Sequence, residues 1–257
     1  LLPGDILYQV EGEDVIGQDL TNVVTMIKGE EGTEVTLTMI RGEETIDFTM
    51  KRQMIEVPTI EHEMLEDQVG YIMITEFDGV TDEQFKEALT ELQNQGMESL
   101  VIDLRNNGGG SVESVCNIAD ELLPEGAIVY TEYKGNERIA RNSDADCINL
   151  PMSVIINGAT GSASEILSGA LQDYGVATIV GTQSYGKGIV QSTLDLQDGT
   201  ALKLTTAKYY TPNGNDIHGV GITPDVEIDL PEELKTEVTL SFEEDVQLQK
   251  AIEVLQQ

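Results

Sequence analysis

The sequence predicts a mixed α/β fold with a mostly parallel β-sheet. Between residues 69 and 180, short apolar runs typical of buried strands alternate with segments whose apolar residues recur at helical spacing. Such alternation favours crossover connections between parallel strands. Residues 1–52 instead show short strands around one helix, and the region after residue 180 is rich in strands. We therefore expect a small domain, an α/β core and a strand-rich flanking region.

Composition and charge limit the classes of partner. The chain has 257 residues, of which 40% are hydrophobic, which is enough for a large core. Its formal net charge of −33 argues against nucleic acids and anionic membrane surfaces as partners. The two cysteines, Cys116 and Cys147, are too few for a disulfide framework and fit no zinc motif, so two unpaired thiols are expected.

The elements expected before the core are short. Strands are predicted at 6–10, 35–40 and 45–50, with an amphipathic helix at 19–28. Residues 53–68 are interpreted as a linker, in which His62 is a surface residue. No signal peptide and no transmembrane run is found, but the chain begins in the middle of a motif, so we expect a targeting segment upstream.

The core, residues 69–230, is expected to hold most of the regular structure. Its predicted strands are 69–75, 100–104, 128–133, 152–157, 176–180 and 201–210, and its predicted helices are 82–95 and 112–123, with a third opening at 162–165. Residues 134–146 are polar and are expected to form an exposed hairpin turn. Residues 231–257 are interpreted as an acidic tail with a short helix at 245–255.

Ser162 is the first candidate for chemistry. It comes after an apolar strand and a tight turn at 158–161 and opens a helical pattern, so backbone N–H groups at the helix start could hold an oxyanion. Lys187, flanked by glycines, could lose solvation and act as a base. The structural alternatives stay open, because Ser162 and Glu165 also form the pattern of a capping box, and Lys187 could be a solvated loop residue.

Two stretches resemble one enzyme family. Residues 162–175, SASEILSGALQDYG, and 186–191, GKGIVQ, resemble the carboxyl-terminal processing (tail-specific) serine proteases of S41 type. In that family a serine nucleophile precedes a general-base lysine by 25 positions, as Ser162 precedes Lys187, and a glutamine at the position of Gln191 orients the lysine. The family usually has serine and alanine where Thr160 and Gly161 stand. The resemblance implies a serine endopeptidase with a Ser-Lys dyad and no metal or cofactor.

A second stretch of the same family surrounds a glycine-rich loop. Residues 103–110, DLRNNGGG, lie between a predicted strand and a predicted helix, and they resemble the segment that contributes to the family's oxyanion hole. The resemblance implies that the backbone N–H groups of Gly109 and Ala163 bind the oxyanion. The family usually has proline where Gly108 stands.

The opening stretch LLPGDIL and the order of elements after it resemble the C-terminal part of a PDZ domain. The resemblance implies that the helix at 19–28, through Val24 and Ile27, lines a peptide groove whose partner strand is missing from this truncated module. It further implies polypeptide substrates with apolar C-termini and an extracytoplasmic location, at the cell surface or in the periplasm, with anchoring through an upstream segment. A homo-oligomer is compatible with this interpretation.

Other functions fit the sequence less well. Residues 181–187 match a P-loop in part, but Gly188 replaces its Ser or Thr, and a strand comes next where a P-loop needs a helix. The Gly-x-Ser-x-Gly elbow of α/β-hydrolases is absent around Ser162. A catalytically silent or gated peptide-binding module of the same fold remains the alternative.

Overall fold

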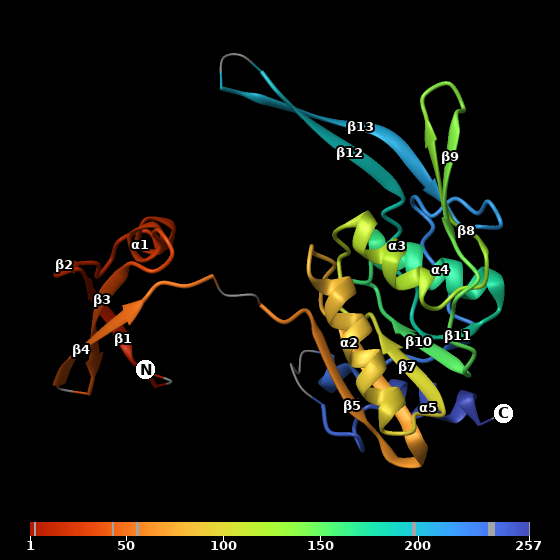
Figure 1. Cartoon of the computed structure of the whole chain (residues 1–257), viewed down its shortest axis with the longest axis horizontal. Helices are drawn as coiled ribbons and strands as arrows, with labels where there is room; N and C mark the ends of the chain where they lie inside the picture. Colours follow the sequence, from red (N-terminus) through yellow and green to blue (C-terminus); the bar gives the residue numbers. More distant parts are fainter. Residues whose placement is uncertain (3, 43, 55–56, 197–198, 236–239, 257) are drawn as a thin grey trace. The chain divides into compact units, whose positions relative to one another are not determined.

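The chain consists of two compact units, Leu1–Val57 and Pro58–Gln257 (Figure 1). The computed structural model describes residues 1–2, 4–42, 44–54, 57–196, 199–235 and 240–256. Pro3, in the predicted opening turn, and residues 55–56 of the predicted linker lie outside the described residues. Each unit has its own apolar core.

The first unit is a four-stranded antiparallel sheet with one helix. The sheet order is β2-β1-β3-β4. Its elements are β1 (Ile6–Val10), β2 (Glu13–Asp14), α1 (Leu20–Ile27), β3 (Glu34–Arg41) and β4 (Glu44–Lys51). Helix α1 begins where the Asp19 side chain accepts the backbone N–H of Thr21, and it packs Val23 into the small core. The expected strand–helix–hairpin layout is present, while the assignment to part of a PDZ domain stays a prediction.

The second unit is organised around a six-stranded sheet of order β14-β11-β10-β7-β6-β5. Its strands are β5 (Ile60–Met64), β6 (Val69–Ile74), β7 (Ser99–Asp103), β10 (Met152–Ile156), β11 (Ala177–Gly181) and β14 (Val226–Glu227). All neighbouring strands are parallel except β5, which runs antiparallel to β6. The predicted mostly parallel sheet is therefore confirmed.

Helices cover both faces of this sheet. On one face lie α2 (Thr81–Asn94), α3 (Val112–Asp120) and α4 (Ala163–Tyr174), whose apolar residues form the large core. Helix α3 ends three residues earlier than predicted, because Leu122 and Leu123 turn back onto the Ala119 carbonyl just before Pro124. Two short 3₁₀ turns, Glu66–Gln68 and Glu232–Leu234, lie outside these helices.

The other face is covered by α5 (Val246–Leu255), which lies in the segment predicted to be a tail (Figure 1). Its Ala251 is fully buried against Val101, Ile155 and Val180 of the central strands. The Ser153 hydroxyl donates to the Ala251 carbonyl at 2.8 Å. The helix is thus part of the core of the second unit, because its apolar stripe packs against the central strands on this face of the sheet.

A separate four-stranded antiparallel sheet has the order β12-β13-β8-β9. It contains β8 (Gly126–Tyr133), β9 (Arg138–Ser143), β12 (Ile189–Asp195) and β13 (Ala201–Tyr210), and the β12–β13 hairpin projects from the unit (Figure 1). The predicted exposed hairpin turn over residues 134–146 is present but shorter, because the turn spans residues 134–137 and β9 occupies the middle of the segment. Arg138 there pairs with Glu132 and lies 4.4 Å from the centre of the Tyr210 ring, so cross-strand contacts rather than apolar alternation hold this strand.

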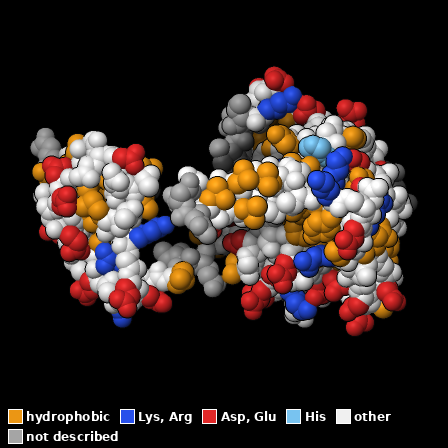
Figure 2. Space-filling model, turned by 90° about the horizontal axis from the view of Figure 1, so that it is seen from above, with side chains coloured by type: hydrophobic (Ala, Val, Ile, Leu, Met, Phe, Trp, Pro, Cys, Tyr) orange, Lys and Arg blue, Asp and Glu red, His pale blue; other side chains and the backbone are white. Residues whose placement is uncertain are grey.

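The acidic surface and the two unpaired cysteines are as expected from the amino-acid composition. Carboxylate side chains are scattered over the face shown in Figure 2. Cys116 is buried and Cys147 is half-buried, and both are free, as expected. Burial raises the pKa of the Cys116 thiol to about 11. Among the described residues, no helix is long and apolar enough to span a bilayer.

Candidate functional site

Three loops meet at one edge of the large sheet. Strand β10 lies between β7 and β11, and all three are parallel, so the loops after them leave the same edge of the sheet. The loop after β7 carries Gly109, the loop after β10 carries Ser162, and the loop after β11 carries Lys187. This is the placement expected for functional loops in an α/β sheet.

Ser162 occupies a strained position at the start of α4. Its φ of 59° and ψ of −115° lie outside the regions that an L-residue favours, and the residue is half-buried. The preceding turn is fixed by Thr160, whose hydroxyl donates to the Leu104 carbonyl at 2.8 Å and accepts the Asn157 N–H at 2.9 Å. The substitution of Thr160 and Gly161 for the family's usual residues therefore leaves a well-anchored turn.

Glu165 joins the loop of Ser162 to the loop of Lys187. This fully buried side chain accepts the backbone N–H of Ser162 at 2.8 Å and that of Lys187 at 2.8 Å, both on Oε2. Its Oε1 accepts the Ser184 hydroxyl at 2.5 Å and the Gly186 N–H at 2.6 Å. Glu165 therefore does more than cap a helix, because it fixes the backbone of both predicted catalytic residues.

Lys187 is solvent-exposed. The sequence leaves two interpretations of this residue open, a desolvated base and a solvated loop lysine. The structure has this side chain exposed, while the backbone N–H groups of residues 186–187 are held by Glu165. Gln191, on β12, is also exposed, and within the described part of the chain no hydrogen bond joins it to Lys187.

The glycine-rich loop lies directly against the Ser162 turn. A Cβ atom on Gly109 would lie 2.7 Å from Ser162 Cβ and 2.8 Å from the Ala163 nitrogen. The Gly109 N–H donates to Asn107 Oδ1 at 2.8 Å, so this predicted oxyanion donor is engaged in an internal hydrogen bond. Ala163 is fully buried at the first turn of α4, beside this loop.

Asn107 fastens the two loops together. It is fully buried, and its carbonyl accepts the Gly161 N–H at 2.9 Å and the Ser164 hydroxyl at 3.0 Å. Its side-chain amide donates to the Ile74 carbonyl at 2.8 Å. One buried asparagine thus connects strand β6, the glycine loop and the start of α4.

Replacing Gly109 by alanine is expected to disable this site. The new Cβ would overlap the Gly161 carbonyl and Ser162, and a φ of +101° is unfavourable for alanine. We expect a loss of stability of about 2 kcal/mol and a loss of activity of at least about 100-fold. Gly108→Ala is the matched control, because its Cβ would meet no atom within 4 Å. Equal activity of the two variants, measured under the same conditions, would show that the close packing of Gly109 against the Ser162 turn is not needed for activity.

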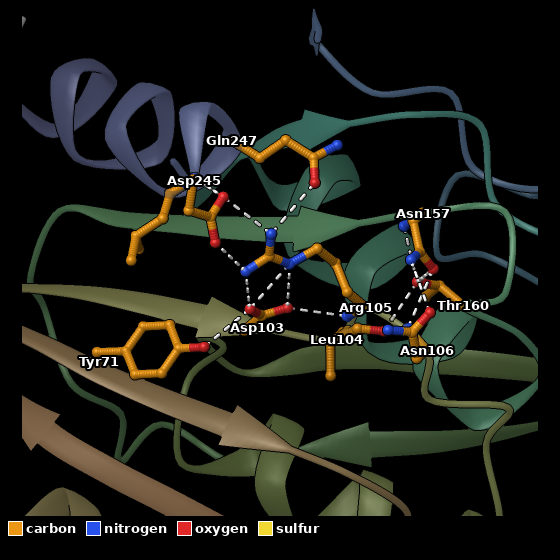
Figure 3. Close-up of polar contacts among 10 residues, drawn as sticks. Tyr71, Asp103, Leu104, Arg105, Asn106, Asn157, Thr160, Asp245 and Gln247 are labelled. Carbon is orange, nitrogen blue, oxygen red and sulfur yellow. Dashed lines mark hydrogen bonds and ion pairs between the residues drawn. The ribbon is translucent and has the colours of Figure 1, made fainter. Parts of the chain in front are cut away.

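A buried ion-pair cluster lies on the opposite face of the sheet from α4 (Figure 3). The Arg105 guanidinium binds the carboxylates of Asp103, at the end of β7, and of Asp245, at the N-terminus of α5. The Tyr71 hydroxyl donates to Asp103 at 2.8 Å. Burial and the Asp103 charge raise the pKa of Tyr71, and the two carboxylates raise the pKa of Arg105 despite the opposing effect of burial.

Val24 and Ile27 lie in the first unit, on α1. Val24 is 36% exposed and Ile27 is half-buried beside the small core. The predicted role of these two residues in substrate binding stays a prediction. Within the described residues, no group of three or more His, Cys, Asp or Glu side chains is arranged to hold a metal ion.

Sequence reasoning missed several residues that build the site. The sequence presents Asn107 and Arg105 only as part of the 103–110 motif, and Glu165 only as part of a capping box and of the stretch 162–175. The only sequence signal for Asn107 and Arg105 is the 103–110 motif itself, in which polar residues stand between a buried strand and three glycines. Asp245, which lies 140 residues from Arg105 along the chain, gave no local signal.

Comparisons with known proteins agree with the geometry. The sequence profile of Peptidase family S41 matches residues 68–228. A Staphylococcus aureus (strain bovine RF122 / ET3-1) protein named "Probable CtpA-like serine protease" is 38% identical over 233 residues, which cover 89% of this chain and 47% of that protein. A Staphylococcus saprophyticus protein with the same name is 37% identical over 233 residues, with the same coverage of 89% and 47%.

A solved structure is also similar. The photosystem II D1 C-terminal processing protease is 32% identical and superposes with a TM-score of 0.64 over 91% of this chain and 65% of that one. The chain spans about half the length of the curated relatives it matches.

Proposed function

Because this chain belongs to peptidase family S41, we propose that it is a serine endopeptidase that cleaves polypeptides near their carboxyl termini. Ser162 is the nucleophile and Lys187 is the general base of a Ser-Lys dyad. The observation that carries the proposal is the Glu165 carboxylate, which binds the backbone N–H groups of both residues. One buried side chain thus holds the backbone of both residues in neighbouring loops, which supports their assignment to one dyad.

The chemistry proceeds through an acyl-enzyme. Lys187, in its neutral form, takes the proton of the Ser162 hydroxyl as the oxygen attacks the scissile carbonyl, and the protonated lysine then gives the proton to the leaving amine. Water next attacks the acyl-enzyme with Lys187 again as base, which releases the new carboxyl terminus. The first helical turn of α4 favours the negative oxygen formed at each step.

The Ala163 N–H is one proposed oxyanion donor. Gly109 supplies the other once its N–H leaves Asn107 Oδ1, since the loop already lies against the Ser162 turn. In the same step we propose that the bound substrate covers the exposed Lys187 and removes water from it, which favours the neutral amine. Gln191 then orients the lysine. In this proposal, the arrangement in which the Gly109 N–H is bonded to Asn107 and Lys187 is exposed belongs to the resting enzyme.

The proposal extends to recognition and location. The first unit acts as a partial PDZ module that binds the apolar C-terminus of a substrate through Val24 and Ile27 on α1. We propose an extracytoplasmic site of action, which is the location that the resemblance to tail-specific proteases implies. The exposed Lys187 favours one alternative, a gated or silent peptide-binding module of the same fold.

Active-site labelling combined with a cleavage assay tests the proposal. A fluorophosphonate probe should modify Ser162, located by peptide mass spectrometry, and an unstructured protein with an apolar C-terminus should be cleaved at a rate that rises with pH as the lysine deprotonates. Lys187→Ala should abolish both reactions, whereas Lys203→Ala, at another exposed lysine on β13, should leave them unchanged. Labelling without cleavage would indicate a gated site. Cleavage that survives in Lys187→Ala would refute the dyad.

A further inference from the structure

We propose that Arg105 is a positioning residue for the glycine loop, and that Asp245 of helix α5 holds it in place from the far side of the sheet. The inference rests on the proposed function, since the loop in question is the one that supplies an oxyanion donor. It assigns a role in catalysis to the C-terminal helix, which contributes no group to the reacting atoms.

The side chains at the end of β7 point to alternate faces of the sheet. Leu104 is fully buried in the large core beneath α2, α3 and α4. Asp103 and Arg105, on either side of it, point to the opposite face, where α5 begins (Figure 3). The end of β7 is therefore held on both faces of the sheet. Arg105, which is held on the α5 face, is followed directly by the loop of residues 106–110.

The Arg105 guanidinium is bound on all of its nitrogen atoms. Its Nη2 donates to Asp103 Oδ2 at 2.6 Å and to Asp245 Oδ2 at 2.7 Å, and its Nη1 donates to Asp245 Oδ1 at 3.0 Å. Its Nε donates to both Asp103 oxygens at 3.0 Å. Gln247 Oε1 accepts from Nη1 at 3.2 Å. Bidentate contacts to two carboxylates fix the plane of the guanidinium as a lysine ammonium could not.

The ion pairs of Arg105 are buried. The side chains of Arg105, Asp103 and Asp245 are 13%, 1% and 7% exposed, so one cation neutralises two carboxylates out of bulk water. Removing the cation would leave the two carboxylates facing each other. The cluster thus has one low-energy arrangement, in which the backbone of Arg105 is held at a fixed place.

Arg105 fixes the first end of the loop, while Asn107 fixes its middle. Its residues have no apolar anchor, and they include Asn106 with a φ of 61° and Gly109 with a φ of 101°. The loop is held by several hydrogen bonds, among them Arg105 N–H to Asp103, Asn106 N–H to Asn157, and Phe77 N–H to the Gly109 carbonyl. A displacement of Arg105 would therefore be passed on to Gly109, which lies against Ser162.

The role of Asp245 differs from that of an ordinary helix cap. Its Oδ1 accepts the Leu248 N–H at 2.9 Å, which caps α5, while both oxygens bind Arg105. An asparagine at position 245 can still accept the Leu248 N–H and so cap α5. It cannot accept hydrogen bonds from Arg105 on both side-chain atoms, because one of them is then an NH₂ donor. Asp245→Asn therefore separates the loop contact from the cap.

The control must loosen α5 without touching Arg105. Ser153→Ala removes the hydrogen bond from the Ser153 hydroxyl to the Ala251 carbonyl, in the middle of the same helix. The site is fully buried, so this variant also reduces the stability of the α5 contact. It leaves Arg105, Asp103 and Asp245 unchanged.

The test combines hydrogen exchange with kinetics on the full chain. In Asp245→Asn, amides of residues 105–109 should exchange at least about tenfold faster, and kcat for an unstructured substrate protein should fall about 10- to 100-fold with KM changed by less than about twofold. Asp245→Glu should restore part of the loss. Ser153→Ala should lower the melting temperature but change neither loop exchange nor kcat.

Two results would overturn the proposal. One is unchanged loop exchange in Asp245→Asn, and the other is a fall in kcat that Ser153→Ala reproduces at equal loss of stability. Failure of the proposed function has a different signature, namely no fluorophosphonate labelling of Ser162 in the parent chain. The exchange comparison would still decide then whether Asp245 and Arg105 hold the loop.

Discussion

Ser162→Gly is expected to abolish activity while leaving the protein at least as stable as the parent. The φ of 59° and ψ of −115° at this position are unfavourable for serine and accessible to glycine. Such a conformation costs about 1–3 kcal/mol, of which glycine returns part as extra entropy of the unfolded chain. A net gain of about 1 kcal/mol corresponds to a rise of about 2–4 °C in melting temperature. Proteolysis should fall by at least about 1,000-fold.

Ser162→Ala is the matched variant for this experiment. Alanine removes the hydroxyl but keeps the Cβ, so it should be as inactive as Ser162→Gly without the gain in stability. Melting temperatures by calorimetry and residual cleavage by mass spectrometry check both variants. A Ser162→Gly protein less stable than Ser162→Ala would show that the backbone at this position is not strained.

Glu165→Gln is expected to cause the second largest effect. Glu165 is fully buried and accepts four hydrogen bonds, two on each oxygen. In glutamine an NH₂ group replaces one of these two oxygens. That NH₂ group and the two donors that faced the oxygen are then all donors, so none of them has an acceptor. We expect a loss of about 3 kcal/mol in the free energy of unfolding, since each unsatisfied buried donor costs about 1–3 kcal/mol. Activity should fall by about 100-fold or more, because the loop of Lys187 is released.

Urea unfolding and the cleavage assay measure the two effects of Glu165→Gln. The control is Ser168→Ala on the same helix, where the lost hydrogen bond, from the Ser168 hydroxyl to the Ser164 carbonyl, touches neither catalytic loop. That variant should lose about 1 kcal/mol and keep its activity. If Glu165→Gln behaved in the same way, Glu165 would have a structural role only.

The alternating core was predictable because its signal is local. The apolar runs at 100–104 and 152–157 and the helical spacing at 82–95 each depend on residues within one element. The same reasoning failed for β9, whose residues are mostly polar and whose stability comes from partners on β8 and β13 such as Glu132 and Tyr210. It also failed to place α5 in the core, because an acidic composition around the helix hid the importance of its apolar stripe.

The site was predictable to a similar extent. The turn into α4, the glycine loop and the loop after β11 were identified, and the parallel strands bring them to one edge. The exposure of Lys187 could not be predicted, because it depends on which groups pack over a loop, and sequence spacing does not encode this. The hydrogen bond from the Gly109 N–H to Asn107 Oδ1 could not be predicted either. It joins two residues that are close in the sequence, and such a local side-chain bond competes with any external acceptor for the N–H.

The late position of α5 in the chain has a consequence for biosynthesis. Strands β7, β10 and β11 emerge from the ribosome well before the helix that covers Val101, Ile155 and Val180, and the Ser153–Ala251 contact closes a loop of 98 residues. Until residues 246–255 have been synthesised, these apolar side chains of the central sheet lack the helix that covers them. A nascent chain at that stage is prone to aggregate and is a natural client for chaperones. It also lacks Asp245, so under the role proposed for Arg105 the loop of residues 106–110 should reach its final order only once α5 has formed.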